Sequence, residues 1–257
     1  MSVIAIIPAR MASSRFPGKP LIDILGLPMI EHVRRRALLC PVLDDVIVAT
    51  CDQAIIDVVA HYGGKVVMTS AQHEGCVDRV AEAAESIDCD MVINLQGDMP
   101  LVHPKSLEKL IKPMMAEDDL LFADMIGPIT QDEEIHCANI VKVVFDKHQN
   151  ALYYSRESIP STRKNSKNIP VTLYKQFGVN AFRRESLISF ANTPRTVLED
   201  IESIDMLRLL ENGEQIRMVL SEYPVVGVDT PQDVNRVEFL MEKDPYFMLY
   251  KGQTGKR

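Results

Sequence analysis

The sequence of 257 residues has no long apolar run, no charge block and no Gly/Ser-rich tract. No segment approaches the roughly 20 apolar residues of a membrane-spanning helix, and the run Val3–Ile7 is too short for a signal sequence and typical of a buried strand. Nothing indicates disorder or a long linker, and 46% hydrophobic residues can bury a full core. We therefore expect a single domain over residues 1–245 and a loosely held tail over 246–257.

The sequence has few cysteines, and their spacing does not suggest pairs. They form no CxxC motif, and their number is odd: Cys40, Cys51, Cys76, Cys89 and Cys137. A disulfide framework or zinc ribbon is therefore not expected, and a reducing cytoplasm fits best. His73-x-x-Cys76 with a distant His136-Cys137 matches no closed zinc pattern, so scattered structural residues are favoured over a zinc site.

An excess of positive charge is also missing. The formal net charge is −8, which would repel a phosphate backbone, so nucleic acid is not expected as the main partner. Neither GxxxxGK[ST] nor GxGxxG occurs, and a P-loop or a dinucleotide-binding site thus lacks its motif. An anionic substrate has to be attracted by a local cluster of cations.

What the first half does contain is an alternation of short β-rich runs and helical patterns. Strands are predicted at Val3–Ile7, Asp45–Thr50, Lys65–Met68 and Asp90–Leu95. One helix is predicted from a cap at Asp52 to about His61, with Gly63 as its left-handed stop, and Pro104 opens another. This rhythm predicts an α/β fold with a mostly parallel sheet covered by helices on both faces.

Beyond about residue 120 the pattern changes. Strand candidates separated by polar loops are Leu121–Met125, Ile140–Phe145, Ala151–Tyr154 and Phe177–Phe182. We expect residues 120–190 to form a smaller lid subregion. A helix from about Val197 to Asn212, a strand near Val225–Val228 and a last helix opened by Thr230 and Pro231 complete the prediction.

The most informative segment, Pro8 to Pro20, directly follows the first strand. It places three cations, Arg10, Arg15 and Lys19, within ten residues, with small residues between them. Open α/β sheets bind ligands outside the carboxyl ends of their strands, and backbone N–H groups and cations there suit phosphate oxygens. A triphosphate site is favoured over an ordinary basic surface loop.

A second cluster, Asn94-Leu95-Gln96-Gly97-Asp98, ends an apolar strand. Gly97 permits a tight turn, and Asp98 then projects a carboxylate where phosphates would lie. Mg²⁺ takes one or two protein carboxylates and fills its shell with phosphate oxygens and water, so Asp98 suits a magnesium ligand better than a simple turn residue.

A partner carboxylate, Asp229, precedes the last predicted helix. Thr230 and Asp233 form a capping box at the start of that helix. Two roles of Asp229 are therefore equally supported: it could bind a metal ion, or it could merely complement the helix dipole.

An acidic side of the helix near residue 200 is formed by Glu199, Glu202 and Asp205, which are spaced by three. It could bind sugar hydroxyls. Because Thr196-x-x-Glu199 is itself a capping box, these residues alone favour a structural role.

Together these motifs resemble the 3-deoxy-manno-octulosonate (Kdo) cytidylyltransferases, from Ile6 to about Val237. The residues that carry the resemblance include Pro8-Ala9-Arg10, Ser14-Arg15, Pro17-Gly18-Lys19-Pro20, Gln96-Gly97-Asp98, Tyr154-Ser155-Arg156, Leu198-Glu199 and Val228-Asp229-Thr230-Pro231. The resemblance implies a glycosyltransferase-A-like nucleotidyltransferase fold and transfer of CMP from CTP to a 2-keto-3-deoxy sugar acid, for surface polysaccharide or lipopolysaccharide synthesis. It also implies a homodimer and a lid subregion that takes part in dimerisation.

The resemblance further implies site roles. Catalysis would depend on Arg10, Arg15, Lys19 and Asp98, with Mg²⁺ held by Asp98 and Asp229. The nucleotide would be bound by Pro8, Ala9, Arg10, Ser14, Arg15, Lys19, His73, Asp78, Arg79, Gln96 and Gly97. The sugar acid would be bound by Gln96, Arg163, Gln176, Asn180, Glu199, Glu202 and Asp205, with Arg163 as partner of its carboxylate.

Several acceptor-pocket positions depart from the family pattern. They are Met99, Gln176, Asn180, Asp205 and Met206, and Cys76 stands where the family usually has Gly. Amides in place of an imidazole and a phenol change donors, acceptors and size. The acceptor is therefore left open between Kdo, an amino-substituted relative, another ulosonic acid and a phosphonate. A sugar-1-phosphate nucleotidyltransferase and a catalytically silent relative are the alternatives.

Overall fold

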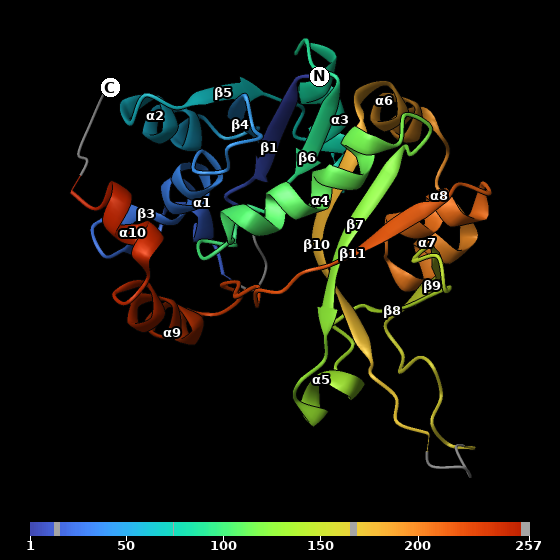
Figure 1. Cartoon of the computed structure of the whole chain (residues 1–257). Coiled ribbons are helices and arrows are strands. Elements are labelled where there is room, and N and C mark those ends of the chain that lie inside the picture. Colours follow the sequence, from blue (N-terminus) through green and yellow to red (C-terminus); the bar gives the residue numbers. More distant parts are fainter. Residues whose placement is uncertain (13–15, 74, 165–168, 253–257) are drawn as a thin grey trace.

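The computed structural model describes residues 1–12, 16–73, 75–164 and 169–252. Within them a nine-stranded sheet has the order β11-β7-β10-β6-β1-β4-β5, with β8 beside β10 and β9 beside β8 (Figure 1). Its strands are β1 Val3–Ala9, β4 Asp45–Thr50, β5 Lys65–Met68, β6 Met91–Asn94, β7 Phe122–Pro128, β8 Lys142–Phe145, β9 Ala151–Ser155, β10 Tyr174–Arg183 and β11 Ile216–Leu220. Along the main path only β10 runs antiparallel to its neighbours. The expected mostly parallel sheet is confirmed.

Helices cover both faces of the sheet, as expected. They are α1 Met29–Ala37, α2 Gln53–His61, α3 Cys76–Glu85, α4 Pro104–Ala116, α5 Asp132–His136, α6 Arg184–Asn192, α7 Val197–Glu202, α8 Met206–Glu211, α9 Pro231–Met241 and α10 Pro245–Tyr250. A short 3-10 helix, Lys19–Leu21, and the small hairpin of β2 Asp23–Ile24 and β3 Leu27–Pro28 connect β1 to α1. No helix in the described ranges is long and apolar enough to cross a membrane.

The core has two layers because successive strand residues point to opposite faces. Ala5 and Ile7 of β1 pack into the layer that contains residues of α1, α2 and α4. Ile4 and Ile6 pack into the layer with residues of α3, α6 and α8. In Figure 1, α4 crosses in front of the sheet.

The predicted helix from Val197 to Asn212 is wrong in one respect, because it is two helices. Ser203 adopts a left-handed backbone conformation, with φ of 52°, and ends α7. Few non-glycine residues adopt this conformation, so the 3.6-residue pattern gave no sign of the break. As a result Glu199 and Asp205 do not share one helix face.

The predicted strand near Val225–Val228 is also wrong, since this segment is irregular and β11 lies earlier, at Ile216–Leu220. Likewise the tail is not loose from residue 246. Residues 245–250 form α10, and Phe247 and Tyr250 are buried with Val237 and Met241 of α9. The glycines and basic residues of the tail concealed this apolar helix face.

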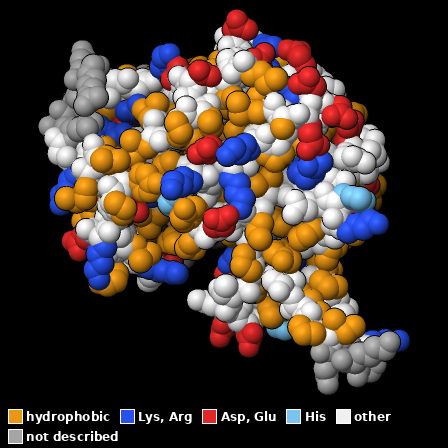
Figure 2. Space-filling model, viewed as in Figure 1, with side chains coloured by type: hydrophobic (Ala, Val, Ile, Leu, Met, Phe, Trp, Pro, Cys, Tyr) orange, Lys and Arg blue, Asp and Glu red, His pale blue; other side chains and the backbone are white. Residues whose placement is uncertain are grey.

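One segment projects from the body. Residues on either side of the undescribed positions 165–168 extend, together with the first half of β10, toward the lower right of Figure 1. The matching projection in Figure 2 lies below a body on which basic and acidic side chains are interspersed. That face therefore offers no basic stripe for nucleic acid.

Candidate active site

Three distant segments meet at Lys19. Its Nζ lies 2.6 Å from Oδ2 of Asp98 and 3.6 Å from Oδ1 of Asp229. Lys19 comes from the segment after β1, Asp98 from the segment after β6, and Asp229 from the turn before α9. The carboxyl ends of parallel strands β1 and β6 share one sheet edge, so the fold unites the residues that the sequence singled out separately.

Backbone contacts hold this meeting point in place. A Cβ on Gly97 would lie 3.0 Å from the carbonyl oxygen of Pro8, so glycine allows the two segments to approach closely. The N–H of Val228 donates to the carbonyl oxygen of Asp98 at 2.9 Å, which brings Asp229 alongside. Asp52 does not cap α2 with its side chain, because its carboxylate accepts a hydrogen bond from the N–H of Met11.

The residues present fit a magnesium ion. The Asp98 side chain is 31% exposed and that of Asp229 is 53% exposed, so both can reach a phosphate-bound ion from the protein side. Two carboxylates are the number that Mg²⁺ takes when phosphates and water fill the remaining positions. No group of three or more His, Cys, Asp and Glu residues forms a metal cluster in the described part of the chain, which argues against a closed all-protein site.

The other predicted phosphate ligands lie near the same edge. Pro8 and Ala9 are buried at the end of β1, and Arg10 follows them as an exposed side chain. Arg10 and Asp98 both act electrostatically on Cys76, which places this charged edge next to the pocket that Cys76 lines. Ser14 and Arg15 lie outside the described residues.

A pocket of about 380 Å³ opens beside this edge. Its lining includes four of the predicted acceptor ligands, Gln96, Gln176, Asn180 and Asp205. Cys76 has exposed surface toward this hollow, yet the surrounding protein desolvates it and raises the pKa of its thiol to about 11. Cys76 therefore narrows the pocket as a neutral thiol and not as a nucleophile.

A buried carboxylate lies next to the pocket. Asp124 of β7 accepts hydrogen bonds from the Tyr154 hydroxyl at 2.9 Å, Gln176 Nε2 at 2.8 Å and Asn180 Nδ2 at 2.7 Å. Burial raises the pKa of Asp124 to about 7, although these donors favour its ionised form. No residue pattern pointed to Asp124, and the available signal was a single acidic residue within the apolar strand Phe122–Met125.

The raised pKa of Asp124 predicts a pH-dependent stability. The folded state holds this proton more tightly than the unfolded state, in which the pKa is near 3.8, so the stabilisation is complete below pH 4 and is lost as the pH rises toward 7. The unfolding free energy of the wild type, relative to Asp124→Asn, should fall by about 1.4 kcal/mol per pH unit from pH 5 to 7. Urea unfolding at several pH values measures it. A difference that does not change with pH would contradict it.

The predicted nucleotide ligands near α3 have structural partners. Arg79 is 3% exposed and donates to the Thr69 hydroxyl and to the carbonyl oxygen of Ser70. His73 pairs with Glu82. These contacts hold the segment that leads into α3. The Arg79 guanidinium is buried and bonded to protein groups, which does not support the expectation that it binds the nucleotide directly.

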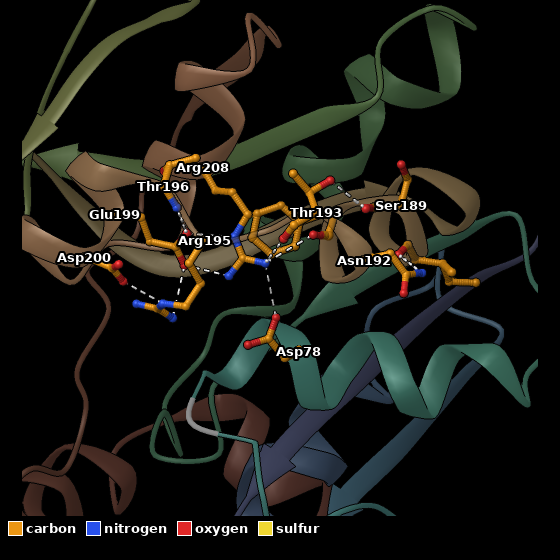
Figure 3. A network of polar contacts seen from close by, with 11 residues as sticks. Asp78, Ser189, Asn192, Thr193, Arg195, Thr196, Glu199, Asp200 and Arg208 are labelled. Atoms are coloured by element: carbon orange, nitrogen blue, oxygen red, sulfur yellow. Dashed lines mark hydrogen bonds and ion pairs between the residues drawn. The ribbon is translucent and has the colours of Figure 1, made fainter.

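The three acidic residues predicted near position 200 have different partners, and Figure 3 shows those of Glu199, among them Arg208 and Arg195. Glu199 is fully buried, completes the capping box with Thr196 and forms a paired contact with Arg208, at 2.7 and 2.6 Å. Asp78 lies 3.5 Å from the same guanidinium. Glu199 therefore does not line the pocket, contrary to the prediction.

Glu202 is engaged elsewhere too, because its carboxylate accepts from the Ser155 hydroxyl and from the N–H of Arg156. Among the three acidic residues only Asp205 lines the pocket, and burial raises the pKa of its carboxyl group. The expectation that all three face one pocket is therefore wrong. The break at Ser203 separates Asp205 from the other two, and the partners of Glu199 and Glu202 hold their carboxylates elsewhere.

Arg163 is likewise not at the pocket. It is exposed on the projecting segment, where its N–H donates to the Ser161 hydroxyl, and it is absent from the pocket lining. The guanidinium that does line the pocket is Arg156, whose donors go to the carbonyl oxygens of Ala138, Glu202 and Ser203.

Comparisons with known proteins show which proteins this chain resembles. Residues 4–216 match the family model described as Cytidylyltransferase. The chain is 40% identical over 245 residues to the 3-deoxy-manno-octulosonate cytidylyltransferase of Geobacter metallireducens, covering 92% of this chain and 96% of the relative. It is 43% identical over 248 residues to the 8-amino-3,8-dideoxy-manno-octulosonate cytidylyltransferase of Shewanella piezotolerans, covering 95% and 100%.

A solved structure, CMP:2-keto-3-deoxy-manno-octonic acid synthetase complexed with CTP, superposes with a TM-score of 0.88 at 38% identity, over 95% of this chain and 99% of that one. A cytidylyltransferase from Leptospira borgpetersenii superposes with a TM-score of 0.65 at 15% identity, which supports the fold alone.

Proposed function

Because this chain belongs to the cytidylyltransferase family, we propose that it transfers CMP from CTP to the anomeric hydroxyl of a 2-keto-3-deoxy sugar acid and releases pyrophosphate. The observation that carries the proposal is the meeting of Lys19, Asp98 and Asp229 beside a polar pocket. The chemistry would be an in-line displacement at the α-phosphorus. The free cysteines of the described chain fit a reducing compartment, the cytoplasm, and the product would serve surface polysaccharide or lipopolysaccharide synthesis.

The chain's own residues would bind, orient and neutralise. Lys19 and Arg10, together with Arg15, would hold the phosphates and balance the charge that develops as pyrophosphate leaves. Asp98 and Asp229 would hold Mg²⁺, which when bound supplies further neutralisation of that charge. Gln96, Gln176 and Asn180 would position the acceptor, since correct placement of the attacking hydroxyl accounts for much of the rate in such reactions.

An amino-substituted acid is the second candidate acceptor. The relative from Shewanella piezotolerans carries that substrate in its name, and the pocket of this chain presents the Asp205 carboxylate together with amide groups. A silent relative is disfavoured because Asp98 and Asp229, the proposed magnesium ligands, lie close to Lys19 in a compact arrangement. We also propose a homodimer, which sedimentation at micromolar concentration tests.

An acceptor panel tests the proposed function. Pyrophosphate release from CTP is measured with Kdo, its 8-amino analogue, other ulosonic acids and simple phosphonates. The proposal expects release with at least one ulosonic acid, and with CTP far more than with UTP or GTP. Silence with every acid, or turnover of a sugar phosphate with UTP or GTP, would refute it.

Removal of divalent cations should abolish turnover. Because Mg²⁺ would neutralise the phosphates between the two carboxylates, chelation is expected to lower the rate by more than about 100-fold, and added Mg²⁺ should restore it. Chelation should leave the thermal unfolding midpoint unchanged, because no described cluster forms a closed metal site. Full activity in excess chelator would contradict the assignment.

A further inference from the structure

A polar row crosses the apolar sheet next to the pocket. Asn94 of β6, Asn180 of β10 and Asp124 of β7 lie directly opposite one another in the strand register. All three are at most 3% exposed. The row continues into apolar residues on both sides, with Ile6 on β1 and Met218 on β11. Buried polar groups in such a setting have to be matched donor to acceptor.

The carboxylate of Asp124 determines the orientation of its neighbours. An ionised carboxylate only accepts hydrogen bonds, so both neighbouring amides turn their NH₂ groups toward it: Asn180 Nδ2 at 2.7 Å and Gln176 Nε2 at 2.8 Å. The carbonyl oxygen of Asn180 therefore faces Asn94, whose Nδ2 donates to it at 3.2 Å. The charge of Asp124 thus determines the orientation of three side-chain amides, those of Gln176, Asn180 and Asn94.

The end of this chain of hydrogen bonds is an unused acceptor. Asn94 Oδ1 is buried and has no hydrogen-bond partner among the described residues. Asn94 lines the pocket, as do Gln176 and Asn180. Gln176 directs its Nε2 toward Asp124, so its Oε1 lies on the other side of the amide, where it can accept from a ligand. The pocket therefore offers amide oxygens.

We infer that Asp124 is a positioning residue that turns these amide oxygens toward the acceptor, so that the pocket selects a sugar acid whose nearest substituent is an ammonium group over one with a hydroxyl there. The inference rests on the proposed function. Asp205 on the same wall adds a carboxylate, and the Arg156 guanidinium is already committed to backbone carbonyl oxygens. An ammonium group only donates hydrogen bonds, which matches this lining.

Asp124→Asn should reverse one of the amides. An asparagine of the same shape presents one NH₂ group, so either Asn180 or Gln176 has to turn its oxygen toward residue 124. If Asn180 turns, Asn94 has to turn as well, so that its Oδ1 accepts from Asn180 Nδ2 and is no longer an unused acceptor. If Gln176 turns, its NH₂ group faces the pocket. A hydroxyl can change from donor to acceptor, whereas an ammonium group cannot.

The test compares two acceptors that differ only in an amino or a hydroxyl group at the terminal carbon. At pH 8, above the pKa of Asp124 of about 7, the wild type should prefer the amine in kcat/KM. Asp124→Asn should lower the amine-to-hydroxyl ratio by about tenfold or more, mainly through KM. Tyr154→Phe removes the third donor and leaves both amide contacts, so it should keep the wild-type ratio within about twofold.

A second readout does not depend on turnover. Side-chain amide signals of Asn94, Asn180 and Gln176 in ¹⁵N NMR spectra should shift in Asp124→Asn and stay in place in Tyr154→Phe. An unchanged ratio in a folded, active Asp124→Asn enzyme, or unchanged amide signals, would overturn the inference while the proposed function stands. If the wild type transfers CMP to neither of these two acids, the acceptor panel decides the proposed function, and the ratio of the two acids' binding constants, from calorimetry, decides the inference.

Discussion

Asp98→Asn is expected to lower kcat for pyrophosphate release by about 10²–10³-fold and to leave the fold intact. The substitution removes the negative charge that lies 2.6 Å from Lys19 Nζ and keeps the shape of the side chain. The backbone contact from the N–H of Val228 to the carbonyl oxygen of residue 98 is unaffected. Steady-state kinetics at saturating CTP, with the Mg²⁺ concentration varied, measures the loss.

The matched control is Asp119→Asn. Asp119 is an exposed aspartate just before β7, at the opposite edge of the sheet. It should retain full activity, and both variants should unfold in urea within about 1 kcal/mol of the wild type. If Asp98→Asn kept more than a fifth of wild-type turnover, Asp98 could not be the metal ligand.

Arg208→Met is expected to destabilise the protein by about 3–5 kcal/mol. It leaves the fully buried Glu199 carboxylate without its paired guanidinium, and it removes a cation that lies 4.2 Å from the Phe190 ring. Arg195, at 3.2 Å from Glu199, is half-exposed and compensates only in part. Urea unfolding monitored by circular dichroism gives the change in free energy.

Two further variants identify the cause of that loss. The double variant Glu199→Gln/Arg208→Met removes both charges and should recover a substantial part of the stability. Lys109→Met breaks an exposed ion pair with Glu222 and should cost less than about 1 kcal/mol. A loss in Arg208→Met no larger than in Lys109→Met would show that the buried pair does not stabilise the junction of α7 and α8.

The sheet and the phosphate edge were predictable because both depend on local signals. The four strands of the first half and the helices opened by Gln53 and Pro104 formed as expected, since apolar periodicity dominates there. The capping box of Thr230 with Asp233 is also present. Asp229 could not be assigned from the residues alone, because its position beside Asp98 depends on a backbone contact between segments 130 residues apart.

The acceptor pocket was harder to predict because it depends on register and backbone breaks. The left-handed Ser203 separates Asp205 from Glu199, and no propensity marks that residue. A register shift in β10 between Gln176 and Asn180, a span that contains the positive-φ Gly178, lets both amides reach Asp124. A shift of this kind changes which residues of the two strands lie opposite each other, and the two-residue alternation of a strand does not reveal it.

The fate of the α-phosphate tests the account's central claim most directly. CTP labelled at the α-phosphorus is incubated with the wild type, Mg²⁺ and the preferred ulosonic acid. The products are then separated and identified by mass spectrometry. The account predicts that the label appears in a CMP ester of the acid, with one pyrophosphate formed for each ester. Label found only in free CMP or CDP, with no ester, would contradict it.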